Sequence, residues 1–528
     1  MGRSRQLHMN TLPRPSLAHR CVLAAFLAFA GLAAEQPAIA QSPSASPPGL
    51  RSARTGEIPA RTLTLDDVID LAEARSEQIA IAQFGVARAA AGEQRARSER
   101  LPQLGAGASY DRTLQSEFSG IFSGDAADGG FGGGDFSELP FGQPNAFRLN
   151  LAFSQALYAG GRIAAQQQLA AVGRTVAESS LKSARAQLVL DATQAFYDAA
   201  LTDRLVSIAE ASLQQAEATL AQVQLSYEAG RAPEFEALRA RVARDNQRPN
   251  VIRAKANRTI AYLRLKQLLE IPASQQLTVT AELDDVTLDP PSRFTTQLDA
   301  VTAAPASQTA AARVPVLQAS SAVQAREAAF RITKSQRRPY MSLNSALGEV
   351  AYAGLPGFDD WRTNWTVGAS VQIPLFTGGR LKAEEISAGA DVGEARARQK
   401  LALELAEAET EAALALLEAA VATWQASAGT VEQASRAYSI ADLRYREGIS
   451  TQLELLDARL VLQSAQVNRA QAARDVQVAR ARVSLLPELP LGNAAVDAAG
   501  SVGALLQSTA QAGAARAAAA TGSAGGIR

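Results

Sequence analysis

Two parts of this chain repeat one another at a fixed spacing of 218 residues. The motif YAGGR begins at Tyr158, and FTGGR begins at Phe376. A second pair, LSYEAG at 225–230 and LRYREG at 443–448, has the same spacing. An internal repeat of this kind indicates that one structural unit occurs more than once, and overlooking it leads to a wrong prediction of the whole fold. The sequence therefore predicts two copies of one structural unit.

Each copy contains a very long stretch without proline, at 162–229 and 380–447, directly after a Gly-Gly pair. At roughly 1.5 Å per residue, each stretch predicts a helix about 100 Å long. In the second stretch, small and apolar residues recur in steps of four and three, which predicts a coiled-coil seam. The seam consists of Leu401, Leu405, Ala408, Ala412, Ala415, Ala419 and Ala422. An ordinary long coiled coil also fits this stretch taken alone.

Strand-like segments precede each Gly-Gly pair. Residues 147–158 and 365–376 alternate apolar and polar side chains, which is the period of a β-strand with one apolar face. Weaker partner strands follow Pro102 and Pro339, which are 237 residues apart. Four strands of this length could cross a bilayer, but about eight are needed for the smallest closed barrel. If the strands lie in lipid, several chains must share one barrel. An open sheet edge cannot stay in lipid, because its backbone hydrogen-bonding groups would have no partners there.

The first forty residues have the pattern of a secretory signal peptide. A basic region and an apolar run lead to Ala38 and Ala40, the A-x-A cleavage pattern. We expect cleavage after Ala40, although an uncleaved anchor has a similar pattern. The only cysteine, Cys21, and both histidines, His8 and His19, lie in this segment. The mature chain therefore lacks the residues for disulfides, thiol catalysis, histidine-based triads and ordinary zinc sites.

Charge and composition exclude further classes. The chain has 52 Lys and Arg against 52 Asp and Glu, whereas nucleic acid favours a clustered basic surface. We therefore expect no nucleic acid partner, and we expect no cofactor. A Gly- and Asp-rich insertion at 124–142 lacks the GK[ST] signature of a phosphate loop. We interpret it as a surface loop.

These motifs resemble the TolC-like outer membrane efflux family, the outer membrane factors of tripartite efflux and type I secretion systems. The resemblance covers about Leu63 to Leu486. It rests on the opening LTLDDVIDLA, the proline before each hairpin, both [YF]xGGR turns, both Y-x-x-G tips and the segment LRLKQLLEIP. It implies a mainly α chain with membrane β, and a trimer whose twelve-stranded β-barrel is continuous with a periplasmic α-helical barrel.

The resemblance also implies a place and partners. We expect the outer membrane of a Gram-negative bacterium, with contact to outer membrane lipid and an extension into the periplasm. The partners would be two further copies of the chain, a periplasmic adaptor protein and an inner membrane transporter. The expected organisation is a signal peptide at 1–40, an N-terminal linker at 41–62, repeat 1 at 63–272, an irregular equatorial segment at 273–315, repeat 2 at 316–486 and a low-complexity tail at 487–528.

Particular residues take roles by the same resemblance. The turns between membrane and periplasm are Gly160, Gly161, Gly378 and Gly379. The helical tips that dock the adaptor are Ala229, Gly230, Arg231, Glu447, Gly448 and Ile449. Glu454 and Asp457 match the acids that constrict the pore entrance, and Glu236 and Tyr445 match a contact between the tips in the closed state. Ser450 stands where the family has a basic residue, which Arg231 or Arg446 could replace.

Glu454 also has a simpler interpretation. It lies three residues after Thr451, the spacing of a capping box, in which a threonine and a glutamate close the first turn of a helix. Thr64 and Asp67 fit the same motif more loosely.

The expected function is a passive exit duct for efflux or type I secretion, powered by an inner membrane transporter, and not an enzyme. The alternative is a periplasmic coiled-coil structural protein without a pore. An adaptor protein fits less well, because it has one helical hairpin where this chain predicts two. A carboxylate-dependent hydrolase would need two acids in one cleft, and no motif frames such a cleft.

Overall fold

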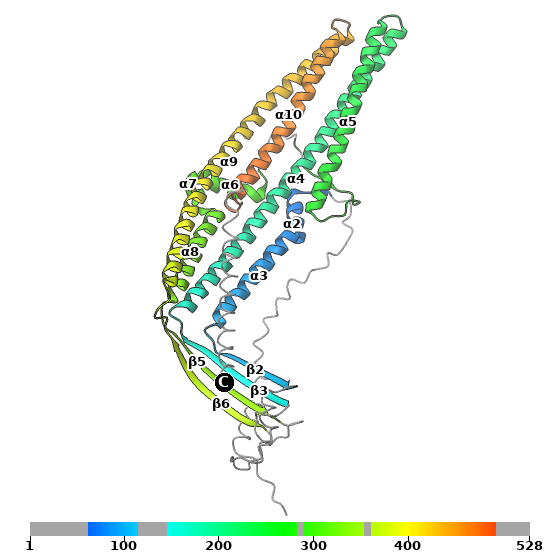
Figure 1. Ribbon diagram of the computed structural model, residues 1–528. Coiled ribbons are helices and arrows are strands. Elements are labelled where there is room, and N and C mark those ends of the chain that lie inside the picture. Colours follow the sequence, from blue (N-terminus) through cyan, green and yellow to red (C-terminus); the bar gives the residue numbers. More distant parts are fainter. Residues whose placement is uncertain (1–61, 115–144, 282, 284–289, 353–360, 493–528) are drawn as a thin grey trace, which may run out of the picture. The chain divides into compact units, whose positions relative to one another are not determined.

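The computed structural model describes residues 62–114, 145–281, 283, 290–352 and 361–492, which belong to one compact unit (Figure 1). The expected signal peptide, nearly all of the linker, the insertion and most of the tail lie outside the described residues. Within the described part, no helix is both long enough and apolar enough to cross a membrane.

Two helices of 67 residues each dominate the chain, α4 (Arg162–Glu228) and α9 (Arg380–Arg446). Both begin directly after a Gly-Gly pair, as the repeat predicted. Each packs against the helix that follows it, α5 (Glu234–Leu268) and α10 (Gln452–Leu485), and α4 also packs against α10 (Figure 1). The two long helices and both helical hairpins are therefore confirmed.

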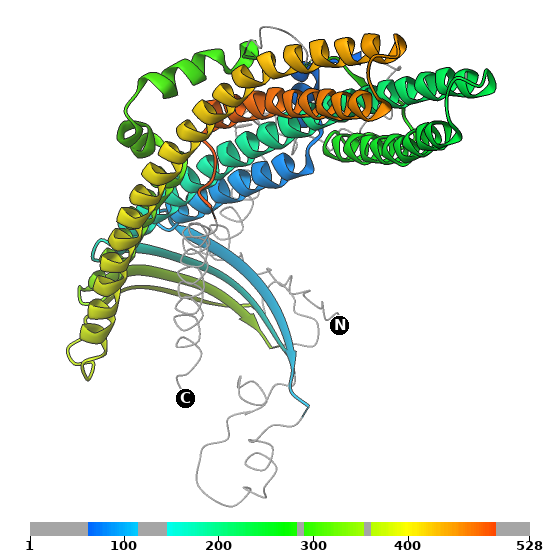
Figure 2. The same ribbon diagram turned by 90° about the horizontal axis from the view of Figure 1, so that it is seen from above.

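Four antiparallel strands form one sheet in the order β2-β3-β5-β6. They are β2 (Gln103–Arg112), β3 (Asn145–Tyr158), β5 (Tyr340–Ala351) and β6 (Arg362–Gln372), and they curve side by side (Figure 2). The pairing of β3 with β5 joins the two repeats. Within the described residues, one edge of β2 and one edge of β6 have no partner strand.

The register divides this sheet into an apolar and a polar face. Directly opposed residues share a face, and the pairs Leu104–Phe153, Leu151–Leu347 and Leu347–Trp365 place apolar side chains together. The alternate positions are mostly small or polar. They include Ser109, Asn150, Ser154, Asn344, Thr366 and Ser370. Arg148 and Asp111 form an ion pair on this polar face.

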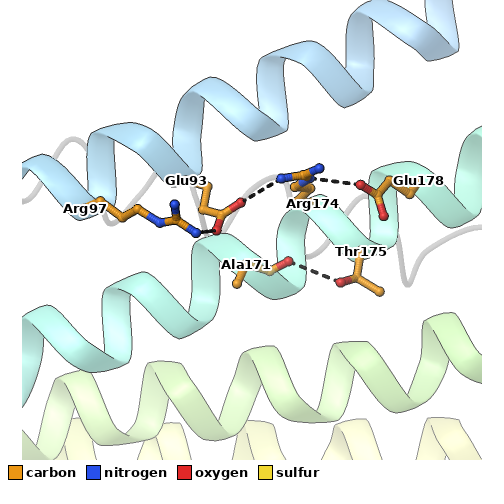
Figure 3. A network of polar contacts seen from close by, with 6 residues as sticks. All are labelled: Glu93, Arg97, Ala171, Arg174, Thr175 and Glu178. Atoms are coloured by element: carbon orange, nitrogen blue, oxygen red, sulfur yellow. Dashed lines mark hydrogen bonds and ion pairs between the residues drawn. The ribbon is translucent and has the colours of Figure 1, made fainter. Parts of the chain in front are cut away.

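The helices that precede each hairpin, α3 (Glu77–Ser98) and α8 (Val314–Ser335), both pack against α4, and α8 also packs against α9. Glu93 on α3 lies between Arg97 of its own helix and Arg174 of α4 (Figure 3). Arg174 also pairs with Glu178, at 2.9 Å. The hydrogen bonds from Arg174 to Glu178 and Glu93, together with the charges of these carboxylates, raise the pKa of the Arg174 guanidinium. This exposed chain of charges connects α3 to α4.

The largest core surrounds the middle of α4. Phe196 and Tyr197 of α4 pack with Ile69 of α2 (Leu65–Arg75), Leu265 of α5 and Val478 of α10. Burial raises the pKa of the Tyr197 hydroxyl to about 12. Next to this core, β1 (Thr62–Leu63) pairs in parallel with β4 (Thr278–Val279). The middle of the helical part is therefore its best-packed region.

The expectation of an irregular segment at 273–315 was wrong in part. It contains α6 (Ser292–Ala303) and α7 (Ala306–Ala312), and α8 already begins at Val314. Both short helices start directly after a proline, whose fixed φ suits the start of a helix. Phe294, Leu298 and Val301 of α6 are buried at helical spacing. The apolar period of each short helix is brief and flanked by prolines, so it does not distinguish a helix from a loop in the sequence.

The predicted coiled-coil seam of α9 is not buried within the chain. Leu401 is 57% exposed, and the seam alanines Ala408, Ala412, Ala415, Ala419 and Ala422 are exposed as well, whereas Leu405 is partly buried against a core cluster. A neighbouring stripe of Ala406, Thr410 and Ala413 is buried instead, where α9 packs against α7 and α10. An alanine-rich helix has more than one stripe of small residues, so its period alone does not determine which stripe the chain covers.

Candidate functional site

Both helical hairpins turn at a left-handed glycine. Gly230 has φ +70° and Gly448 has φ +73°. The next backbone amides donate to earlier carbonyls, Arg231 to Ser226 and Ile449 to Arg444, both at 2.8 Å. This is the pattern that ends a helix when the residue after it is left-handed. No atom lies within 4 Å of a Cβ built on either glycine, so conformation rather than space requires glycine here.

The residues expected to dock a partner are at the surface. Ala229, Arg231, Glu447 and Ile449 are all exposed. Sequence reasoning missed Phe235, a large apolar side chain that is exposed in the first turn of α5. The signal that could have found it is its position, five residues after the tip glycine. The two tips therefore present exposed apolar side chains beside charged ones.

Glu454 does not form the expected capping box. Its backbone amide does donate to the Thr451 hydroxyl, at 3.4 Å. Its carboxylate does not return to the backbone of Thr451 but forms an ion pair with Arg444, whose Nη1 lies 3.2 Å from Oε1. The looser candidate, Thr64 with Asp67, forms the full box. Arg444 lies within reach across the hairpin, so the Glu454 carboxylate pairs with it instead of accepting from the backbone amide of Thr451.

Asp457 lies one turn after Glu454 on the exposed side of α10. Residues three apart on a helix share a face, so the structure brings the two predicted acids together. No hydrogen bond or ion pair holds Asp457 within the described part of the chain. Among those residues there is also no cluster of three acids, histidines or cysteines suited to a metal ion.

The other predicted pair, Tyr445 and Glu236, interacts electrostatically across the two hairpins, although no hydrogen bond joins the two side chains among the described residues. Burial raises the pKa of the Tyr445 hydroxyl, and the negative charge of Glu236 on α5 raises it further. Neither candidate arginine makes the expected salt bridge between the tips. Arg446 pairs with Asp442 of its own helix at 2.7 Å, and Arg231 has no ion pair among the described residues. The hydroxyl of Ser450 is buried without a partner.

Two buried polar side chains near the second tip were not anticipated. Gln452 and Arg459 of α10 are both almost fully buried. Burial lowers the pKa of the Arg459 guanidinium, while the nearby Tyr438 raises it. The repeat pairs Arg459 with Arg241, which is exposed on α5. The two copies therefore place the same residue type in different environments, and the packing of α10 buries the second one.

All four glycines of the two Gly-Gly turns have positive φ, between +58° and +91°. At the first turn, Arg338 donates to the carbonyl of Gly160 at 3.1 Å, and a Cβ on Gly160 would lie 2.6 Å from the Cβ of Arg338. The second turn is uncovered. Leu375 and Phe376, directly before it, are 93% and 91% exposed. The same turn is therefore packed in the first repeat and open in the second.

The sequence profile described as outer membrane efflux protein matches residues 68–270 and 306–486. The chain is 24% identical over 353 residues to nodulation protein T of Rhizobium leguminosarum, covering 67% of this chain and 70% of that protein. It is 23% identical over 408 residues to the pyoverdine export outer membrane protein OpmQ of Pseudomonas putida, covering 77% and 82%.

Two solved structures share the fold. The outer membrane protein VceC of Vibrio cholerae has a TM-score of 0.64 at 21% identity, covering 80% of this chain and 96% of that one. The MtrE outer membrane channel of Neisseria gonorrhoeae, solved in an open state, also has a TM-score of 0.64, at 19% identity and with coverage of 80% and 89%.

Proposed function

This chain belongs to the outer membrane efflux protein family, and from that premise we propose that three copies close into one continuous exit channel. The protein is an outer membrane exit duct for efflux. We further propose that a periplasmic adaptor docks at its helical tips and that an inner membrane transporter supplies the energy. The non-pore coiled-coil alternative is not favoured, because the family consists of transport conduits.

The proposal rests on the contact between the two repeats. This contact forms once inside the chain, and the equivalent surfaces at the two outer edges have no partner among the described residues. Inside the chain, repeat 1 meets repeat 2 where β3 pairs with β5 and α4 packs against α8. The equivalent surfaces of β6 and α9 on one side, and of β2 and α3 on the other, have no such partner among the described residues. Placing repeat 2 of one copy beside repeat 1 of the next would reproduce the internal contact.

Three such junctions would give twelve strands, enough for a closed barrel without free edges. The apolar face with Trp365, Val367 and Val371 would then meet lipid, and the polar face with Asn150 would line the lumen. The open turn at Gly378 and Gly379, with the exposed Phe376 before it, would be covered by the neighbouring copy. The exposed seam of α9 would pack there as well.

A disulfide test follows from the register. Ala152 faces Ala346 where the repeats meet inside the chain, and the two repeat offsets place Ser370 of one copy opposite Ser109 of the next. Directly opposed Cβ atoms lie about 4.5–5.5 Å apart, close to the reach of a disulfide. We expect the variant carrying Ser370→Cys and Ser109→Cys to give covalent trimers after oxidation, seen on a non-reducing gel.

The control pairs Ser370→Cys with Tyr110→Cys. Tyr110 is adjacent to Ser109 but points to the other face of the strand, so this variant should form few crosslinks. Covalent dimers without trimers in the first variant would contradict a ring of three copies. Equal crosslinking of both variants would contradict the proposed register.

We propose that Glu454 and Asp457 from three copies surround the periplasmic entrance. Clustered carboxylates create a negative potential, and charged rings set the selectivity of channels. In planar bilayers, the purified trimer should prefer K⁺ over Cl⁻, and Mg²⁺ on the periplasmic side should block it. Glu454→Gln with Asp457→Asn should remove the block and the cation preference at unchanged trimer yield.

The control for this experiment is Glu418→Gln. Glu418 is an exposed acid on α9, more than seven helical turns from the tip, so its loss should leave both properties unchanged. Mg²⁺ block that persists unaltered in the double variant would refute the assignment of the entrance. A purely structural role for Glu454, in its ion pair with Arg444, predicts that result together with a small loss of stability.

A further inference from the structure

The two tips of this chain differ in the charges that surround their acids. The repeat aligns Glu454 with Glu236, so each tip has a glutamate in the first turn of its return helix. In the last turn of the preceding helix, the second tip has Arg444, and the repeat aligns this residue with Ser226 in the first tip. Only the second tip therefore combines a glutamate with a basic residue at the end of the preceding helix.

The structure shows that this arginine contacts the glutamate. The Nη1 atom of Arg444, in the last turn of α9, lies 3.2 Å from Oε1 of Glu454, in the first turn of α10. Both side chains are about half exposed, so the pair lies at the surface of the tip rather than within the bundle. The pair joins the two helices on either side of the turn at Gly448.

Among the described residues, Arg444 is the basic side chain that forms an ion pair with one of the proposed entrance acids. Arg446 lies two residues later, on nearly the opposite side of α9, and pairs with Asp442 at 2.7 Å. Arg459 is buried near Tyr438. Asp457 has no ion pair in the described part of the chain, and Glu447 is exposed beside the tip glycine.

We infer that Arg444 determines the charge selectivity of the channel entrance, by neutralising one of the two carboxylates that each chain contributes there. This inference rests on the proposed entrance at Glu454 and Asp457. Three copies would bring six carboxylates and three guanidinium groups together, so the entrance would carry half of the negative charge that its acids alone suggest. Asp457 would supply the uncompensated half.

The test compares ion selectivity in planar bilayers under a KCl gradient. Arg444→Gln should raise the ratio of K⁺ to Cl⁻ permeability by about tenfold at roughly 0.1 M salt. Three unit charges about 8 Å from the axis in water, with a Debye length of about 10 Å, change the stability of each ion there by about threefold, upward for K⁺ and downward for Cl⁻. Mg²⁺ block should strengthen in the same variant.

A charge-restoring variant makes the test specific. Arg444→Gln combined with Glu454→Gln has the same net charge at the tip as the natural chain, so its permeability ratio should return close to the original value. The matched control is Arg446→Gln. It removes the same charge two residues away but on the other side of α9, and it should change selectivity much less.

The possible failures are distinguishable. If Arg446→Gln changes selectivity as much as Arg444→Gln, the effect comes from overall charge and the inference about Arg444 is wrong. If Arg444→Gln leaves ion selectivity unchanged while Glu454→Gln with Asp457→Asn abolishes cation preference, the entrance assignment is supported and only the proposed role of Arg444 is wrong. If none of these variants changes selectivity at normal trimer yield, the proposed entrance itself is wrong.

Discussion

Replacing Glu409 with glutamine is expected to lower the free energy of unfolding by about 3 kcal/mol, because it leaves a buried arginine without its counter-ion. Arg313, at the start of α8, is only 1% exposed. Its Nη2 lies 3.0 Å from Oε2 of Glu409 on α9, and its Nη1 donates to the carbonyl of Ala406. Burial lowers the pKa of Arg313, and the bond to Glu409 opposes that shift.

This ion pair also holds the end of the described chain. The backbone amide of Gly492 donates to Oε1 of Glu409 at 2.9 Å, and the amide of Val314 donates to the carbonyl of Pro487 at 2.7 Å. These two hydrogen bonds hold the segment after α10 against α8 and α9, beside the apolar contacts of Leu491. Loss of the carboxylate should loosen all three elements together.

The two partners are not equivalent, which makes the prediction specific. Glu409 is about one third exposed, so it can reach water when Arg313 is lost. Arg313→Met should therefore cost less than Glu409→Gln, about 2 kcal/mol for the lost charged hydrogen bonds. The double variant should be more stable than Glu409→Gln alone, because an apolar side chain then replaces the stranded charge.

Thermal unfolding of the purified protein in detergent, followed by circular dichroism, ranks these variants. Glu327→Gln serves as the control, because its ion pair with Arg396 at 2.8 Å is solvent-exposed. Such pairs contribute about 1 kcal/mol or less. If Glu409→Gln shifted the midpoint no more than this control, the pair would not be a fastening point.

Gly448→Val is expected to abolish transport while leaving the amount of protein in the outer membrane normal. Its φ of +73° lies in the left-handed region, which costs a residue with a Cβ about 1–2 kcal/mol, and more for a branched side chain. The strain acts at the tip, remote in sequence from the strands. An altered turn would displace Glu447 and Ile449, which we propose as docking residues.

The matched control is Gly429→Val. Gly429 is exposed in the interior of α9 and has neither a positive φ nor an atom within 4 Å of its Cβ position. Efflux can be followed by accumulation of a fluorescent substrate in cells that lack their other channels. Unchanged efflux in Gly448→Val would show that this tip is not a docking surface.

Local patterns determined much of the architecture. The absence of proline over 162–229 and 380–447 predicted both long helices, because helix continuity depends on each residue's own backbone. The two Y-x-x-G motifs predicted the helical turns, since left-handed backbone is a property of glycine itself. Period-two alternation likewise predicted the hairpins, and the register confirmed their apolar face.

Tertiary structure decided which of several equivalent surfaces the chain uses. The exposed seam from Leu401 and the buried stripe at Ala406 have nearly the same composition, and only packing against α7 and α10 separates them. Thr451 and Glu454 have the spacing of a capping box in the sequence, yet the Glu454 carboxylate forms an ion pair with Arg444 across the hairpin instead. Arg313 and Glu409 are 96 residues apart. Such pairs depend on how distant segments meet, and a periodic pattern records only which face of a helix is apolar, not which neighbour will cover it.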